Sequence, residues 1–248
     1  MSKTEWDYTS LAAAYLKRPD YADAAIDAML ARANVGAGAR ACDVGAGVAH
    51  LTRMLEHRGL HVVAVEPNDA MRGFGQTRTR GAAWFDGTGE ATGQPPSAFD
   101  LVTFGSSFNV TDRQKALAET ARIARPRGWF ACMWNHRDLS DPLQAEIERT
   151  IAERVDGYSY GTRREDQSAE IEKSGLFGEV TKIEGMVVHA QTTDECLEAW
   201  RSHATLQRQA GDKFAAVVDA IEAVFVRHAQ KAVLTPYTTR IWLAQLKG

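Results

Sequence analysis

The 248-residue sequence is poor in cysteine, with only Cys42, Cys132 and Cys196, which lie far apart. An odd number without short spacings argues against a disulfide framework and against a cysteine-ligated metal site. No apolar run reaches the ~18 residues that a membrane-spanning helix needs. The first residues lack the basic start and the apolar stretch of a secretory signal. We therefore expect a cytoplasmic protein without a membrane segment or a metal ion.

The sequence also has no excess of positive charge, because 29 Lys and Arg residues face 32 Asp and Glu residues, a formal net charge of -3. Without a basic field there is little to hold a polyanion, so nucleic acid is not expected as a partner. Internal repeats and low-complexity linkers are absent, which predicts a single domain over residues 1–248. The composition leaves a small molecule as the expected partner, and a monomer and a homodimer both remain open.

Short apolar runs bounded by turn residues alternate with stretches of helical spacing in the first half of the chain. The predicted strands are 40–44, 61–66, 82–85, 99–104 and 129–134, and the predicted helices between them are 49–57, 69–79 and 113–124. Such alternation predicts right-handed crossovers and a doubly wound α/β fold with helices on both faces of a parallel sheet.

The second half of the chain predicts two more strands, at 179–189 and 238–246. Helices are expected at 142–155, 167–174, 196–209 and 214–230. We expect a seven-stranded, mostly parallel sheet whose last strand is antiparallel. Residues 1–35 would form an N-terminal lid with a covering helix at 21–33. Residues 193–232 would form a helical cap between the sixth and seventh strands, over the strand ends.

A glycine-rich turn follows the first strand, and two acids accompany it. Gly45 and Gly47 allow a tight turn and a close approach to a ligand, and Asp43 precedes them at the strand end. Glu66 ends the second strand, where a carboxylate can accept from both hydroxyls of a ribose. A dinucleotide fingerprint would have a third glycine where this chain has His50. Asp43 would repel a pyrophosphate but suits a cationic ligand such as the amino acid end of S-adenosylmethionine.

With these residues in place, the sequence resembles the class I, Rossmann-like S-adenosylmethionine-dependent methyltransferases, and in particular the small-molecule enzymes of the UbiE and type 11 group. The similarity covers most of the chain. The segments that carry it are DVGAGVA at 43–49, VVAVEPNDAMR at 62–72, DGTGEATGQP at 86–95, FDLVTFGSSF at 99–108, ALAETARIARPRGWFACMWNHRD at 116–138 and YTTRIWLAQL at 237–246.

The resemblance implies S-adenosylmethionine as cofactor and S-adenosylhomocysteine as product. The implied cofactor-binding residues are Tyr15, Arg18, Asp43, Gly45, Ala46, Gly47, Glu66, Pro67, Asn68, Met71, Gly87, Thr88, Gly89, Ser106 and Ser107. Relatives often have Asp in place of Thr88, so here a hydroxyl or a backbone carbonyl would contact the adenine amino group. Relatives with a QAFHWF-like segment have His where this chain has Asn109, so no base can be carried over to that position.

The acceptor is expected between the strand ends, the N-terminal segment and the helical cap. The predicted acceptor-binding residues are Trp6, Phe108, Asn109, Trp134 and Trp200. His136 is the leading candidate for a general base and Tyr8 the second. Methyl transfer from a sulfonium mainly needs alignment in a dry cavity, so a dedicated base is not required.

The acceptor atom is expected to be a nitrogen or an oxygen of a small metabolite of a bacterial biosynthetic pathway, such as a planar (hetero)aromatic compound. Carbon methylation in quinone, isoprenoid or natural-product metabolism is an alternative. A non-catalytic protein that only binds S-adenosylmethionine is another. A nicotinamide-dependent oxidoreductase and a methyltransferase acting on RNA or protein are less favoured by the missing third glycine and by the charge.

Overall fold

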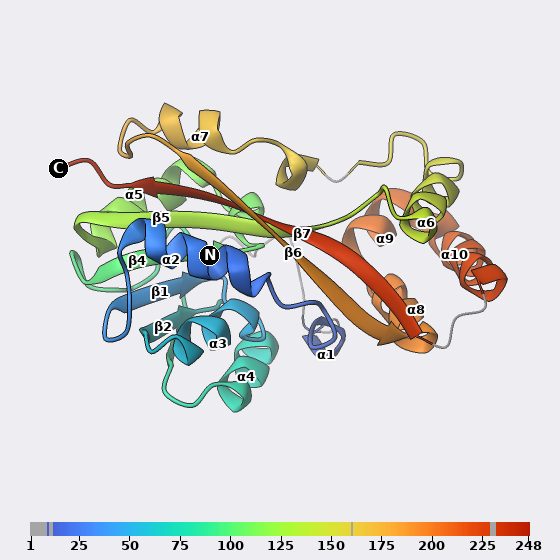
Figure 1. Cartoon of the computed structure of the whole chain (residues 1–248), viewed down its shortest axis with the longest axis horizontal. Helices are drawn as coiled ribbons and strands as arrows, with labels where there is room; N and C mark the ends of the chain where they lie inside the picture. Colours follow the sequence, from blue (N-terminus) through green and yellow to red (C-terminus); the bar gives the residue numbers. More distant parts are fainter. Residues whose placement is uncertain (1–8, 10–11, 160, 229–231) are drawn as a thin grey trace.

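Seven strands form one sheet in the order β3-β2-β1-β4-β5-β7-β6 (Figure 1). The computed structural model describes residues 9, 12–159, 161–228 and 232–248. The strands are β1 (Arg40–Val44), β2 (His61–Val65), β3 (Ala83–Phe85), β4 (Phe99–Gly105), β5 (Ala124–Arg137), β6 (Thr181–Thr192) and β7 (Ala232–Gln245). The first five pair in parallel, and β7 is antiparallel to both β5 and β6. The predicted doubly wound sheet with an antiparallel last strand is confirmed.

Helices cover both faces of the sheet, as the apolar parallel strands require. The helices are α1 (Ala12–Tyr15), α2 (Asp23–Ala33), α3 (His50–His57), α4 (Asp69–Arg78), α5 (Arg113–Ile123), α6 (Pro142–Ala152), α7 (Ser168–Lys173), α8 (Thr193–Arg201), α9 (Ala204–Ala210) and α10 (Phe214–His228), with short 3-10 turns at Phe108–Val110, Gly161–Arg164 and Gly211–Lys213. None of the helices within the described ranges is long and apolar enough to cross a membrane.

Alternate residues of each strand supply two separate cores. Ala41, Leu101 and Ala131 share the face that packs against α2 and α3. Cys42 and Val102 face the other way, toward α5 and α7. Buried apolar surface on both faces explains why these strands read as continuous apolar runs in the sequence.

Helix starts follow the capping residues in the sequence. The side chain of Asn68 accepts from the N–H of Met71 at the start of α4, and Asp112 and Asp141 do the same for α5 and α6. Thr192 and Glu195 form a reciprocal capping box at the start of α8. These caps fix the point at which each strand-to-helix loop ends.

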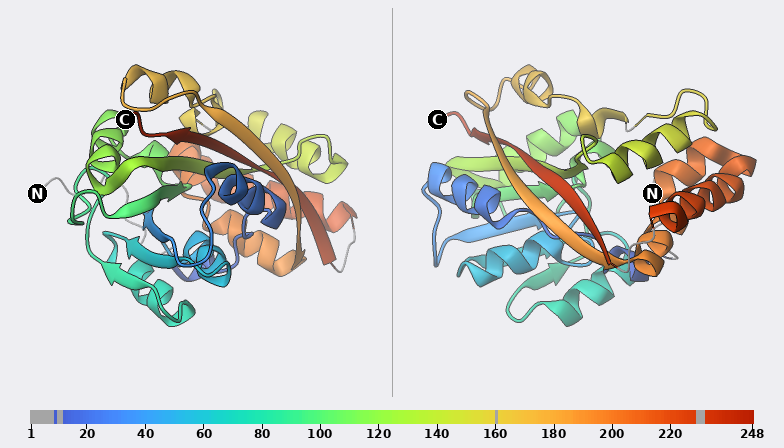
Figure 2. Two further views of the ribbon diagram at one scale, coloured as in Figure 1. Left: turned by 60° about the vertical axis from the view of Figure 1, so that its left-hand side comes forward. Right: turned by 45° about the vertical axis from the view of Figure 1, so that its right-hand side comes forward.

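The long strands differ from the prediction. β5 and β7 are longer than expected, and β6 is shifted by two to three residues. β7 pairs with β5 up to Arg137↔Tyr237 and with β6 over twelve positions, from Thr181↔Leu243 to Thr192↔Ala232. Figure 2 shows this two-stranded ribbon running past the parallel strands to the helices of the second half. The helix expected at 196–209 is divided into α8 and α9, because the ring of His203 accepts from the N–H of Leu206 and starts a new helix.

A third apolar cluster holds the second-half helices together. α6, α8, α9 and α10 bury residues such as Ile147, Trp200 and Ile221 against Val233 of β7. α6 and the segment between β6 and β7 therefore form a helical group with its own core, beside the extended end of the ribbon (Figure 2).

Candidate functional site

The carboxyl ends of β1, β2 and β4 meet at one edge, and a buried acid lies there. Asp43, only 1% exposed, is paired in register with Thr103 of β4 and Ala64 of β2. Its two carboxylate oxygens accept hydrogen bonds from the hydroxyls of Thr52 (2.7 Å) and Thr103 (3.0 Å). The carboxylate is thus held rigidly by two hydroxyl donors.

Burial raises the pKa of Asp43 to about 6, although the hydrogen bonds from Thr52 and Thr103 act in the opposite direction. The nearby charge of Glu66 adds to the increase. A buried acid with a raised pKa stores unfavourable free energy that a bound cation would relieve.

The two glycines of the loop after β1 have different structural roles. A Cβ on Gly45 would lie 2.4 Å from the Cβ of Ser107, so only glycine fits this close approach. Gly47 has a φ of +55°, and none of the described residues lies within 4 Å of the position its Cβ would take. The first glycine is therefore required by packing, whereas the second borders open space that a ligand can enter.

The amides of this loop are already used within the protein. The N–H groups of Gly45 and Ala46 donate to the carbonyl of Val65, and that of Gly47 donates to Oε2 of Glu66 (2.8 Å). In a pyrophosphate-binding loop such amides point at the phosphates. The N–H groups of Gly45, Ala46 and Gly47 are therefore not free to bind a pyrophosphate.

Glu66 is buried at the end of β2 and faces the glycine loop. Its Oε1 accepts from the N–H of Asn68 (2.9 Å), and its Oε2 accepts from Gly47. Burial raises the pKa of Glu66, and the two backbone donors and the charge of Arg72 oppose the increase. A carboxylate has about four lone-pair sites, so each oxygen keeps capacity for one further donor.

The residues after Glu66 build the start of α4. Pro67 is exposed, and Asn68 caps the helix while its amide group donates to Thr9 (3.1 Å). Met71 is buried with Ala12 and Val48 in a small cluster. The cluster packs α1 beside the glycine loop and α4, in accordance with the position of α1 in Figure 1.

The loop after β3 makes a tight turn at the same edge. Thr88 and Ala91 exchange two backbone hydrogen bonds (3.1 and 3.3 Å). A Cβ on Gly87 would meet the carbonyl of Thr92 at 2.8 Å, and one on Gly89 would meet Thr111 at 2.6 Å. Both predicted cofactor glycines are thus required by packing around the turn.

The loop after β4 contains Ser106 and Ser107. The hydroxyl of Ser107 donates to the carbonyl of Val44 (2.6 Å) and ties this loop to β1. Ser106 is exposed, has a φ of +60°, and lies 2.9 Å from the buried hydroxyl of Tyr21. Sequence reasoning missed Tyr21, which lies just before α2 and reads as part of a covering helix.

The N-terminal segment is fastened at the same edge by His50. Its two ring nitrogens lie 2.7 Å from the carboxylate of Asp20 and 2.8 Å from the carbonyl oxygen of Tyr15. Partial burial would raise the pKa of Asp20, but His50 and Arg53 outweigh it and lower the pKa to about 2. The residue that replaces the third glycine of a dinucleotide loop therefore anchors the segment carrying Tyr15 and Arg18.

Arg18 lies over the ring of Tyr15, with its guanidinium carbon 3.7 Å from the ring centre. Among the described residues no carboxylate within ion-pairing distance of Arg18 is found. Both predicted cofactor residues are therefore together on the segment beside the glycine loop. Trp6 and Tyr8 lie outside the described residues.

Two of the predicted acceptor residues are in the core. Phe108 is fully buried and packs edge-on against Phe104 and Phe130. Trp134 is buried too, and its indole N–H donates to the side-chain oxygen of Asn109 (3.0 Å). The structure places Phe108 inside the fold instead of on an open wall, because the 3-10 turn at Phe108–Val110 directs its ring under the sheet.

His136 and Trp200 are not brought together with the acids at the glycine loop. His136 is buried on the face of β5 opposite to Asn135, whose amide donates to the carbonyl of Asp20 (2.9 Å). Trp200 lies in the helical group, stacked on His203 and under the guanidinium of Arg137. Asn135 therefore contacts the described part of the N-terminal segment.

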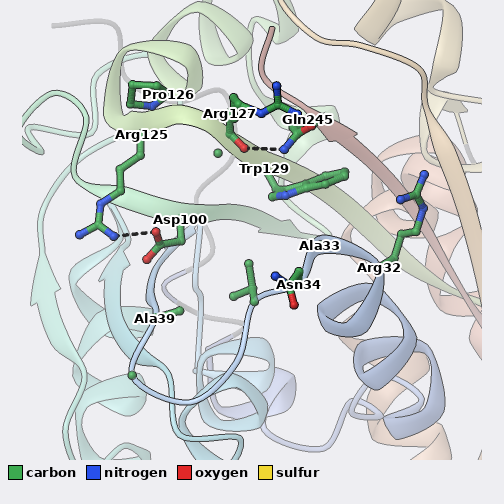
Figure 3. A pocket seen from close by; sticks show the side chains of 13 residues that line it. Arg32, Ala33, Asn34, Ala39, Asp100, Arg125, Pro126, Arg127, Trp129 and Gln245 are labelled. Carbon is green, nitrogen blue, oxygen red and sulfur yellow. Dashed lines mark hydrogen bonds and ion pairs between the residues drawn. The ribbon is translucent and has the colours of Figure 1, made fainter. Parts of the chain in front are cut away.

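A separate cavity of about 590 Å³ opens at the other end of the sheet (Figure 3). Its wall includes Trp129, Arg32 and Arg127, and an ion pair between Arg125 and Asp100 (2.6 Å). It lies at the amino ends of β1 and β4, whereas ligands of open α/β sheets bind at the carboxyl ends. This cavity is therefore distinct from the candidate site.

Part of the chain that includes this site is similar to known methyltransferases. Residues 42–132, from β1 to β5, match the family model described as a methyltransferase domain. An uncharacterised methyltransferase of Mycobacterium tuberculosis is 35% identical over 121 residues, 49% of this chain and 48% of that protein. The ubiquinone/menaquinone biosynthesis C-methyltransferase UbiE of Vibrio vulnificus is 28% identical over 117 residues, 43% of this chain and 45% of that protein.

The chain thus spans about half the length of the curated relatives it matches. A solved structure from Anaeromyxobacter dehalogenans, provisionally named a type II methyltransferase, superposes over nearly the whole chain. Its TM-score is 0.61 at 20% identity, and the match covers 93% of this chain and 97% of that one. Residues 42–132 therefore match a methyltransferase domain, and the chain shares its fold with that solved structure.

Proposed function

We propose that the protein transfers a methyl group from S-adenosylmethionine to a nitrogen or oxygen of a small-molecule acceptor. The observation that carries the proposal is the pair of buried carboxylates at the ends of adjacent strands, Asp43 and Glu66, beside Gly47, whose Cβ position none of the described residues approaches within 4 Å. Since a fold alone does not establish an activity, the proposal depends on these residues.

The residues present fit the cofactor. Each oxygen of Glu66 keeps a lone-pair site for a ribose hydroxyl after its backbone hydrogen bond. Asp43, with its pKa raised to about 6 chiefly by burial, favours a cation nearby. The turn at Gly87–Gly89 would border the adenine, and Ser106 and Ser107 the methionine end. When bound, the cofactor supplies a methyl carbon activated by a positively charged sulfur.

The protein's own part is to hold the cofactor and the acceptor in position and to exclude water. Tyr15 and Arg18 lie on a segment fastened by His50, so this segment covers the glycine loop and Arg18 offers its charge to a carboxylate. Alignment in a dry crevice supplies most of the rate enhancement that such a displacement needs. The acceptor would enter between this segment and the helical group, where Trp200 and Arg137 lie.

Calorimetric titration with S-adenosylhomocysteine tests the site. We expect the wild type to bind, and Glu66→Gln to bind about 10- to 100-fold more weakly, the range for a lost hydrogen bond to a charged group. Asp69→Asn is the matched control, because this nearby carboxylate is solvent-exposed and pairs only with Arg72. Equal affinity in wild type and Glu66→Gln would contradict the ribose role.

Methyl transfer itself is tested with labelled S-adenosylmethionine and a panel of nitrogen, oxygen and carbon acceptors. Release of S-adenosylhomocysteine that depends on a nitrogen or oxygen acceptor supports the proposal. Tight binding with no transfer to any acceptor would instead indicate a protein that only binds the cofactor, and transfer to carbon acceptors alone would favour the C-methylation alternative.

A further inference from the structure

Tyr21 and Ser106 form a hydrogen-bonded pair at the carboxyl end of β4. The proposed cofactor contacts include Ser106 but give no role to the Tyr21 hydroxyl. Their hydroxyl oxygens lie 2.9 Å apart, although the residues are 85 positions apart in the chain. Tyr21 is 6% exposed, whereas Ser106 is exposed at the edge of the sheet. The pair thus connects a buried side chain to the open crevice.

The backbone around the pair is adapted to it. A Cβ on Gly105 would lie 3.0 Å from the hydroxyl oxygen of Tyr21, so glycine leaves room for the phenol. Ser106 has a φ of +60°, a conformation that L-residues adopt at a cost of roughly 1 kcal/mol. Its N–H donates to the carbonyl of Met133 (2.8 Å), which fixes the residue in this position. Strain of this kind is retained mainly where it has a use.

The direction of the hydrogen bond follows from burial. If Ser106 donated, the buried phenol proton would have no acceptor within the part of the chain that the structure describes, and an unsatisfied buried donor is costly. If Tyr21 donates, its proton is satisfied and the exposed Ser106 hydroxyl keeps its own proton for another acceptor. Burial and the neighbouring carboxylates of Asp43 and Asp20 raise the pKa of Tyr21, while Ser106 and Arg18 act against this. The phenol therefore stays a donor.

We infer that Tyr21 is a positioning residue that turns the Ser106 hydroxyl outward, as a hydrogen-bond donor to an oxygen of the amino acid end of the bound cofactor. The inference rests on the proposed function, since it assumes a ligand with a carboxylate at this end of the crevice. Tyr21 acts only through Ser106 and takes no proton from the acceptor.

The test uses two ligands that differ in the amino acid end. S-adenosylhomocysteine has the carboxylate, and 5′-methylthioadenosine lacks the whole amino acid portion. Tyr21→Phe keeps the ring and removes only the hydroxyl, so we expect roughly 2- to 10-fold weaker binding of S-adenosylhomocysteine, the range for one hydrogen bond. Binding of 5′-methylthioadenosine should be unchanged. Tyr158→Phe, which alters a tyrosine packed against the helical group, is the control and should bind both ligands like wild type.

A double-mutant cycle separates positioning from a structural role. Ser106→Ala keeps a side chain at the same strained φ, and Tyr21→Phe in that background should cause no further loss of affinity. Additive losses, equal losses for both ligands, or no loss in Tyr21→Phe would overturn the inference. If the wild type binds neither ligand, the proposed function fails instead, so the two failures are distinguishable.

Discussion

Replacing Asp43 with Asn should make the free protein more stable at pH 8 while weakening its hold on the cofactor. The carboxylate is 1% exposed, and its oxygens accept from the hydroxyls of Thr52 and Thr103 and from the backbone N–H of Thr52. An amide is nearly the same shape, and the threonine hydroxyls can rotate to accept from its N–H₂ group. The substitution therefore removes a buried charge and leaves the packing intact.

The magnitude follows from the pKa of Asp43, which burial raises from 3.8 to about 6. At 1.36 kcal/mol for each pH unit, this increase corresponds to about 3 kcal/mol, to order of magnitude. Because the folded-state pKa is above the unfolded one, the contribution to stability is fully present below pH 3.8 and is lost as the pH rises to about 6. Wild type should thus be as stable as the variant near pH 4 and less stable by up to about 3 kcal/mol at pH 8.

Urea unfolding of the ligand-free proteins at pH 4, 5, 6 and 8 measures this difference directly. We expect the gap between Asp43→Asn and wild type to open between pH 4 and 6 and to stay constant above that. A variant that is destabilised by the same amount at every pH would refute the reasoning, because the carboxylate would then be a net stabilising group. Thr52→Val, which removes one donor and keeps the charge, should be less stable than wild type at pH 8.

Three further predictions concern the same edge of the sheet. Gly45→Ala should destabilise the fold by roughly 2–5 kcal/mol, through strain and a 2.4 Å contact, whereas Gly47→Ala should cost roughly 1 kcal/mol, both by urea unfolding; equal losses would contradict the packing. His50→Gln should speed tryptic cleavage after Lys17, because the N-terminal segment loses an anchor, and unchanged digestion would refute that role. Phe108→Ala should lower the free energy of unfolding by roughly 3–5 kcal/mol, as for a core residue. Unchanged stability would instead support the prediction that Phe108 lines the acceptor site.

The sheet could be predicted because its parallel strands are buried on both faces. Runs such as 40–44 and 99–104 are short, apolar and followed by glycine, so their strand character is local. The lengths of β6 and β7 could not be predicted in the same way. The added residues, 190–192 and 232–237, include Thr, Gln and Pro, and they are in strands because β6 and β7 pair with each other over twelve positions.

The site was predictable where a motif is contiguous and not where it depends on long-range contacts. Asp43 and Glu66 follow from strand ends in the sequence. Tyr21 meets Ser106 across 85 positions, and His50 meets Asp20 across 30, so no local pattern could pair them. Phe108 illustrates the converse, since its place after a strand suggested an exposed ring, but the following turn buries it.

Calorimetric titration of the intact protein at pH 8 with S-adenosylhomocysteine, and in parallel with NAD, tests most directly whether the two carboxylates at the ends of neighbouring strands form a site for the adenosyl and amino acid parts of the cofactor. We predict saturable heat with the first ligand at one site per chain and no heat with the second, because the loop amides that a pyrophosphate needs are already used. Binding of NAD without binding of S-adenosylhomocysteine would contradict the account.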